Sequence, residues 1–398
     1  MSESRAVTDR LDDAVPKPES FTSAVHSPVM TARVGLWLGV SFSICFVTGL
    51  VSHWAYSPDP LVPFPTFPAW GYRLNQGTHI LSGFVSVPLL LVKLGLVYPQ
   101  LFRRPPGLAQ KRALIFEGLE RVSILVLVSS AIFQLAIGVA NQAQWYVFGF
   151  PFRTVHYAMS WVLIGALIVH IAVKLPLISA GLGEDVDSTT LDPDHLEPDE
   201  GALGRRSMLT LTAIAAVGAA ITTVGQSMPG LRNVSVFAAR SGTGPQGVPI
   251  NVSADQARVI GAAKDPSYTL EIVNGAKSVS MTREDLLAMP QATETLPIAC
   301  VEGWSADGTW TGPRIVDLLA AVEAPADADV RFVSLQERGT FRQSVMPSNF
   351  AQDPRTLLAL KLSGEDLVLD HGYPARVIAP NRPGVLQTKW VARIEVLT

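Results

Sequence analysis

Residues 155–178 read VHYAMSWVLIGALIVHIAVKLPLI, an apolar stretch with one lysine and no acidic residue. A helix needs about 20 apolar residues to cross a bilayer, so this stretch predicts a transmembrane helix. Similar apolar stretches occupy residues 34–56, 76–98, 121–143 and 207–227. The sequence therefore predicts an all-α transmembrane bundle of four helices within residues 31–180, and a fifth anchor helix within residues 205–228.

The composition fits a chain embedded in a lipid bilayer. Hydrophobic residues make up 48% of the sequence and charged residues 16%, below the roughly 25% typical of soluble proteins. The net charge of −3 gives no sign of a nucleic-acid partner. Cys45 and Cys300 lie in different regions, so a disulfide framework is not expected. Cys45, in the middle of the first apolar stretch, is expected to be a small packed residue.

Lysine and arginine residues in the short loops predict the orientation. The loop between the second and third stretches is the most basic, with Arg103, Arg104, Lys111 and Arg112. The two neighbouring loops carry one arginine each, Arg73 and Arg153. Because basic loops stay on the cytoplasmic side, the N-terminus is expected inside the cell, with residues 57–75 and 144–154 outside. The chain is thus expected to be a multi-pass protein of the cell membrane.

The segments that flank the bundle are polar. Residues 1–30 contain three prolines and are expected to form a disordered cytoplasmic tail. Residues 181–204 are acidic and are expected to form a solvated cytoplasmic linker. Arg205-Arg206 precedes the fifth apolar run, either as a simple positive-inside flank or as a twin-arginine export signal. In both cases, residues after about 228 are expected outside the cytoplasm.

Four histidines lie within or at the ends of the apolar stretches, namely His53, His79, His156 and His170. Imidazole is costly in hydrocarbon without a partner, and haem iron is such a partner. His156 and His170 are 14 residues apart, close to four helical turns, so they share one face about 21 Å apart. That spacing suits two haems, and we expect His79 to pair with His156. Alternatively, each histidine forms a helix–helix hydrogen bond, and the bundle is a haem-free anchor.

This histidine placement resembles the di-haem cytochrome b subunits of membrane oxidoreductases such as formate dehydrogenase, over about residues 33–178. The resemblance implies one or two b-type haems. The partner of His170 stays open between His53 and His26. The related subunits have a ligand near the inner start of the first helix, and residues 33–37 lack a histidine.

From about residue 245 the composition is that of a soluble β-rich α+β domain. Strand-like runs occur at 268–273, 330–334, 375–378 and 392–397, and helical runs at 283–288 and 314–322. Cys300, alone in this region, is either a buried structural cysteine or a thiolate ligand to a soft metal.

Ordered motifs in this domain carry a second resemblance. Cys300-Val301-Glu302-Gly303-Trp304 is followed by His371-Gly372-Tyr373-Pro374-Ala375-Arg376 and by Gln387-Thr388-Lys389-Trp390. Over residues 248–398 this order resembles the sulfite-oxidase superfamily, especially its branch of periplasmic methionine-sulfoxide reductases. The resemblance implies a molybdenum–molybdopterin cofactor with Cys300 as the catalytic thiolate on the metal. It also implies pterin contacts from His371, Arg376, Lys389, the backbone of Gln387 and Thr388, and Asn251.

The two resemblances together imply an oxidoreductase that transfers an oxygen atom to or from a small-molecule substrate, and the predicted orientation puts that site outside the cytoplasm. Haem would pass the electrons to or from membrane quinone or another carrier. Glu302 and Trp304 make a poor anion site beside Cys300, which weakens the case for sulfite as substrate. Three cations further along, Arg338, Arg342 and Arg382, keep sulfite oxidation open. The remaining alternative is an electron-transfer protein whose outer domain binds the cofactor without catalysis.

Overall fold

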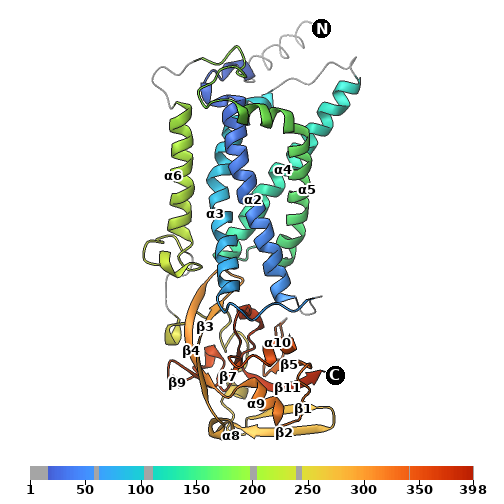
Figure 1. Ribbon diagram of the computed structural model, residues 1–398, viewed down its shortest axis with the longest axis vertical. Coiled ribbons are helices and arrows are strands. Elements are labelled where there is room, and N and C mark those ends of the chain that lie inside the picture. The colour runs from blue at the N-terminus through green and yellow to red at the C-terminus, as the bar shows by residue number, and fades with distance from the viewer. Residues whose placement is uncertain are drawn as a thin grey trace, which may run out of the picture. The chain divides into compact units, whose positions relative to one another are not determined.

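Five long helices make up most of the N-terminal half of the computed structural model (Figure 1). They are α2 (Pro28–Tyr56), α3 (Gly71–Val97), α4 (Lys111–Gln142), α5 (Phe152–Gly183) and α6 (Arg205–Thr223). Each is long and apolar enough to cross a membrane, which indicates membrane association. The structure describes residues 17–57, 62–102, 111–197, 204–238, 244–339 and 341–397.

The chain divides into two compact units. The first contains Met1–Phe46 and Leu81–Thr222, and the second contains Val47–Ile80 and Thr223–Thr398. The end of α2 and the start of α3 therefore belong to the same unit as the C-terminal domain.

The first unit is held together by apolar side chains between α2, α3, α4 and α5, which run side by side (Figure 1). Its buried core contains Met30, Val34, Leu38, Phe42, Leu89, Leu90, Leu96, Ala131 and Leu163. Small polar residues link the first two helices. The Ser86 hydroxyl donates to Ser41 Oγ at 2.9 Å, and Ser41 donates to the Ser82 carbonyl at 2.8 Å.

The N-terminal segment is more ordered than the sequence led us to expect. Residues 1–16 lie outside the described residues, but 3-10 turns form at Pro18–Ser20 and Ala24–His26, and α2 begins at Pro28. The Phe21 ring packs against Tyr98 and Phe102. Because α2 starts earlier than expected, His26 lies two residues before it, and its Nδ1 lies 3.0 Å from the Leu96 carbonyl.

The acidic segment before α6 is not simply solvated. Asp192 is nearly buried in an ion pair with Arg205. Arg206 pairs with Asp185 and Asp187 at the surface. Residues 198–203 of the expected linker lie outside the described residues, as do Arg103 and Arg104 of the basic loop.

The C-terminal domain is built on three sheets (Figure 1). The largest has the strand order β2-β1-β11-β5-β6, in which only β1 and β11 are parallel. Its strands are β1 (Thr269–Asn274), β2 (Lys277–Thr282), β5 (Asp329–Ser334), β6 (Gln343–Met346) and β11 (Val391–Leu397). The helices α7 (Ile260–Ala263), α8 (Arg283–Ala288), α9 (Ile315–Ala320) and α10 (Ser348–Ala351) are short.

Two smaller sheets carry several of the segments that line the cleft described below. One is four-stranded, with β3 (Ala292–Ala299), β4 (Ser305–Gly312), β8 (Lys361–Leu362) and β9 (Glu365–Asp366). The other pairs β7 (Leu357–Ala359) with β10 (Arg376–Ile378). The structure confirms the expectation of apolar helices followed by a sheet-rich domain.

Candidate functional site

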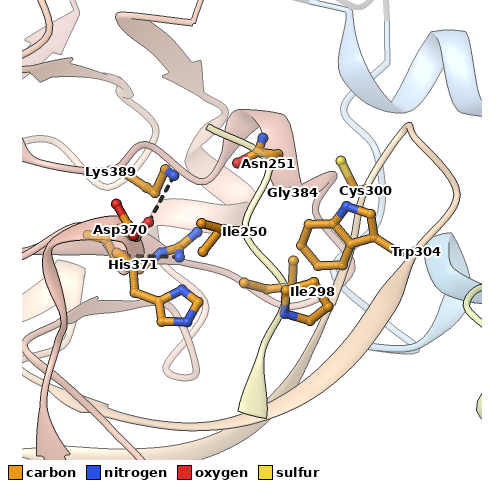
Figure 2. A pocket seen from close by; sticks show the side chains of 11 residues that line it. Ile250, Asn251, Ile298, Cys300, Trp304, Asp370, His371, Gly384 and Lys389 are labelled. Carbon is orange, nitrogen blue, oxygen red and sulfur yellow. Dashed lines mark hydrogen bonds between the residues drawn. The ribbon is translucent and has the colours of Figure 1, made fainter. Parts of the chain in front are cut away.

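A cleft in the C-terminal domain collects residues that are far apart in the sequence (Figure 2). About 290 Å³ of space, partly open to solvent, lies within it. Its lining is Pro249, Ile250, Asn251, Ile298, Cys300, Trp304, Asp370, His371, Arg376, Gly384 and Lys389. In this view Cys300 and Trp304 lie at one end, and Lys389, Asp370 and His371 at the other (Figure 2).

Cys300 occupies a tight turn between β3 and β4. Its backbone N–H donates to the Trp304 carbonyl at 2.8 Å, and the Gly303 N–H donates to the Cys300 carbonyl at 3.0 Å. Gly303 has φ of +89°, a conformation that favours glycine. The turn places the thiol in the cleft, with only 1% of the residue exposed.

Arg376 is the most deeply buried cation of the cleft, with 5% of the residue exposed. Nη1 donates to the His371 carbonyl at 3.1 Å and Nη2 to the Gln387 carbonyl at 3.4 Å. Its Nε has no hydrogen-bond partner among the described residues. Burial lowers the pKa of Arg376 to about 9. A buried guanidinium with only carbonyl acceptors is poorly compensated, and this favours an anionic ligand.

Lys389 is a second cation of the cleft. Its Nζ donates to the backbone carbonyls of Val252 and Asp370, the latter at 3.0 Å. Burial, and after it the positive charge of Arg376, lower the pKa of Lys389 to about 7. An anion between the two cations would relieve their mutual repulsion and favour the protonated lysine.

His371 is buried beside them, and its Nε2 lies 2.6 Å from the Pro245 carbonyl. Burial lowers the pKa of His371 to about 4, so the ring is neutral at physiological pH. Its Nε2–H can then donate a hydrogen bond to the Pro245 carbonyl, which fixes the ring orientation. The following Gly372 has φ of +109°, and a Cβ there would lie 3.1 Å from the Lys389 Cβ.

The cleft thus brings together Cys300, His371, Arg376, Lys389 and Asn251 from the predicted set. Gln387 and Thr388 do not line it. The Gln387 side chain donates to the carbonyls of Ala379 and Arg382, and Thr388 Oγ1 lies 2.8 Å from Ser344 Oγ. Both residues stay predicted backbone contacts.

The three further cations suggested for a sulfite site lie elsewhere. Arg382 is buried and donates to the carbonyls of Leu386 and Val345. Arg338 and Arg342 are exposed, and none of the three lines the cleft. Sequence reasoning missed Ile250 and Asp370, whose only signal is that each directly precedes a predicted residue.

Three of the four histidines in the apolar helices, His53, His79 and His156, have a defined neighbour. A Cβ built on Gly49 would lie 3.1 Å from His79 Cε1, and one on Gly138 would lie 3.3 Å from His156 Cε1. His79 Nδ1 is 3.3 Å from the Thr48 hydroxyl. His53 Nδ1 lies 3.2 Å from the Tyr56 hydroxyl. His53 and His79 belong to the second unit, and His156 and His170 to the first.

Comparisons with known proteins support the expected cofactor class. Residues 257–398 match the oxidoreductase molybdopterin binding domain family. Mitochondrial sulfite oxidase of Mus musculus is 29% identical over 161 residues, which are 33% of this chain and 30% of the relative. The protein-methionine-sulfoxide reductase catalytic subunit MsrP of Ralstonia nicotianae is 27% identical over 157 residues, which are 35% of this chain and 47% of the relative.

A third relative is the putative protein-methionine-sulfoxide reductase subunit YedZ1 of Azospira oryzae, 31% identical over 144 residues. The match covers 36% of this chain and 52% of that protein, so this chain spans about half or less of each of these relatives. The resemblance of the ordered motifs to the sulfite-oxidase superfamily is therefore supported at the level of the superfamily. Residues 257–398 are thus similar to the molybdopterin-binding domain of this oxidoreductase family, and the chain shares similarity with sulfite oxidases and protein-methionine-sulfoxide reductases.

Proposed function

We propose that this chain is a membrane-bound molybdopterin oxidoreductase that transfers an oxygen atom at an extracytoplasmic site. In this proposal, b-type haem in the helical region exchanges the electrons with membrane quinone. The observation that carries the proposal is the cleft itself. It joins one buried thiol, Cys300, to the buried cation Arg376 and the half-buried cation Lys389, and neither cation has a carboxylate ion-pair partner among the described residues.

The donor set fits a molybdenum–molybdopterin cofactor. A thiolate suits a soft metal, and Arg376 and Lys389 suit the phosphate of the pterin. The orphaned Nε of Arg376 offers a donor that a phosphate oxygen would satisfy. When bound, the cofactor supplies the redox change and the site of oxygen-atom transfer. The chain holds the thiol in its turn, orients the phosphate and keeps His371 neutral.

The residues after Cys300 favour an S-oxide over sulfite as the substrate. Trp304 lines the cleft, and its Nε1 donates to the Glu302 carboxylate at 3.4 Å. A carboxylate at this position repels a sulfite anion but tolerates a neutral sulfoxide. Sulfite oxidation stays the alternative substrate reaction because Lys389 also lies in the cleft.

Haem ligation by His79 and His156 is supported by their close packing on glycines. Gly49 has no side chain beyond hydrogen, which leaves room for the His79 imidazole against the adjacent helix, and Gly138 does the same for His156. The Thr48 hydroxyl at His79 Nδ1 would orient the ring, as outer contacts do for metal-bound histidines.

For a second haem we propose His170 with His26. His26 contacts the Leu96 carbonyl, and the electrostatic neighbours of His170 include Lys93, one helical turn from Leu96. Both histidines belong to the first unit. His53, which contacts Tyr56, is the other candidate ligand.

The first test is metal and haem analysis of the purified full chain, the Cys300→Ser variant and the His156→Ala variant. We expect stoichiometric molybdenum and a b-type spectrum in the wild type. Haem should fall only in His156→Ala. Dye-linked turnover of a sulfoxide should be lost in Cys300→Ser, because the metal loses its thiolate ligand.

The contrary outcomes separate the alternatives. Folded wild-type protein without molybdenum, made in a molybdenum-replete host, would contradict the enzyme. Full molybdenum without haem would leave a haem-free anchor. Molybdenum and haem without turnover of sulfoxide or sulfite would favour the non-catalytic electron-transfer protein.

A further inference from the structure

The loop that carries Cys300 is held by polar contacts from two segments of the chain. Gln226 accepts from the Ser305 N–H at 2.7 Å through its backbone carbonyl, and the Ser227 hydroxyl donates to the Gly303 carbonyl. Arg232 donates to the Ser305 carbonyl at 3.1 Å. These three residues follow α6, so the segment after the anchor helix supports the loop.

A second contact to the loop comes from the start of α3. Gln76 is buried, with 6% of the residue exposed, and its Nε2 donates to the Val301 carbonyl at 3.4 Å. Its Oε1 accepts from the Ser52 hydroxyl of α2 at 3.0 Å. The amide is thereby held between α2 and the residue next to Cys300. All of these residues belong to the second unit.

Further contacts seat the same helix start on the C-terminal domain. Arg73 pairs with Asp307 of β4 at 2.7 Å. The Asn381 side chain accepts from the Tyr72 N–H and donates to the Pro65 carbonyl. The Asn381 N–H donates to the Ala69 carbonyl at 3.2 Å. A network of this density fixes the position of α3 against the Cys300 loop.

His79 lies three residues after Gln76 on the same helix, about 4.5 Å further along its axis. Residues three apart are neighbours on one helix face. A short, bonded path therefore leads from Cys300 through Val301 and the Gln76 amide to the helical turn of His79. Electron transfer slows steeply as the gap between bonded atoms widens, so a path whose gap between Gln76 and Val301 is a 3.4 Å hydrogen bond favours transfer.

We propose that electrons pass between the Cys300 site and the His79 haem through the Val301–Gln76 contact, with Gln76 as its positioning residue. This inference rests on the proposed function. Reduction of one sulfoxide uses two electrons and two protons and yields the sulfide and one water, so the path carries two single electrons per turnover. A membrane quinol supplies both electrons and is oxidised to quinone.

The test compares two rates in the full chain in detergent. Reduced methyl viologen delivers electrons to the Cys300 site directly, whereas a short-chain quinol delivers them through haem. We expect Gln76→Met to retain haem, molybdenum and the viologen-linked rate of methionine sulfoxide reduction. The quinol-linked rate, and the rate at which methionine sulfoxide re-oxidises prereduced haem in a stopped-flow trace, should both fall several-fold.

Ser227→Ala is the matched control, because it removes a hydrogen bond to Gly303 of the same loop and leaves the Gln76–Val301 hydrogen bond in place. Its ratio of quinol-linked to viologen-linked rates should match that of the wild type. A merely structural role of Gln76 would lower both rates together. Wild-type haem re-oxidation in Gln76→Met would overturn the proposed path.

A second pair of variants tests the same seating without touching Gln76. Arg73→Asp should slow haem re-oxidation, and the charge-swapped Arg73→Asp/Asp307→Arg should restore it, because the ion pair is re-formed in reverse. Equal haem re-oxidation in all three proteins would contradict the seating. Absence of haem or molybdenum from the wild type would instead contradict the proposed function.

Discussion

Two arginines, one in each unit, are almost equally buried but differ in how their charge is compensated. Arg205 has 6% of its residue exposed and Arg376 has 5%. Arg205 donates to the Asp192 carboxylate and to the carbonyls of Ala24, Val186 and Ser188. Arg376 has two carbonyl acceptors, an orphaned Nε and a contact with the Trp310 ring at 5.1 Å.

The difference separates a structural arginine from a ligand-binding one. A buried charge with a carboxylate and several carbonyls is complete without any ligand. A buried charge without an anion destabilises the fold, and a bound phosphate would offset that cost.

The same contrast bears on the interpretation of Arg205-Arg206 as an export signal. Arg205 cannot serve as an exposed export signal while it holds Asp192, so any recognition as a signal must precede the folding of this region.

The largest expected effect is loss of the Asp192 carboxylate. Asp192→Ala would leave the Arg205 guanidinium buried without its counter-ion, and breaking such a pair costs about 3–5 kcal/mol. Amide hydrogen exchange of residues 184–192 and 24–26, measured on the full chain in detergent, should rise strongly. Asp185→Ala is the control, since its partner Arg206 is exposed. Unchanged exchange in Asp192→Ala would show that Arg205 is not a structural clamp.

The next largest effect is expected at Arg376, on the retention of the cofactor. Arg376→Met should weaken pterin retention by about 10- to 100-fold, because hydrogen bonds to a charged group contribute about 1.5–3 kcal/mol. The cofactor-free protein should be as stable as the wild type or more so, because an uncompensated charge is replaced by an apolar side chain. Molybdopterin released on dilution and thermal unfolding of the cofactor-free chain measure the two effects. A strongly destabilised cofactor-free variant would make Arg376 structural, like Arg205.

The apolar helices and the cleft were predicted from the sequence by different means and with different success. The apolar helices follow from length and hydropathy, and α2 to α6 lie where the runs predicted them. The start of α2 was missed, because Pro28 and the polar residues before it suggested a tail, whereas contacts of Phe21 with Tyr98 and Phe102 order that segment. Contacts between distant segments have no local signature in a single sequence.

In the cleft, the ordered motifs predicted Cys300, His371, Arg376 and Lys389, and the structure brings these four together. The partners of their neighbours could not be predicted. Gln76 is an ordinary polar residue at the start of an apolar helix, and nothing local relates it to Val301, 225 positions later. Arg205 and Arg206 likewise look equivalent in sequence, although only one of them is buried.

A smaller effect is expected from Lys389 as pH changes. Its folded pKa of about 7 lies below the ordinary value of 10.5, so the unfolded chain holds a proton between these values that the folded chain lacks. The cofactor-free domain should therefore gain stability as pH rises from about 7 toward 10.5. Binding of pyrophosphate as a probe should instead weaken as pH rises through about 7, because the lysine loses its charge. Lys389→Met should abolish both dependences in pH titrations by calorimetry, and a variant that keeps them would assign them to another group.

The smallest expected effect is that of Arg206→Ala. The Arg206 side chain is 65% exposed, and its pairs with Asp185 and Asp187 are at the surface. Such pairs are screened by solvent and contribute little to stability, so amide exchange around residues 184–192 should barely change. Because Arg206→Ala should leave the fold almost unchanged, the variant can test the other suggested role of Arg205-Arg206, that of an export signal. If protease treatment of whole cells shows that the C-terminal domain no longer reaches the outer side in Arg206→Ala, the cause is lost export rather than lost folding. Normal exposure of the domain in this variant would instead favour Arg205-Arg206 as a simple positive-inside flank.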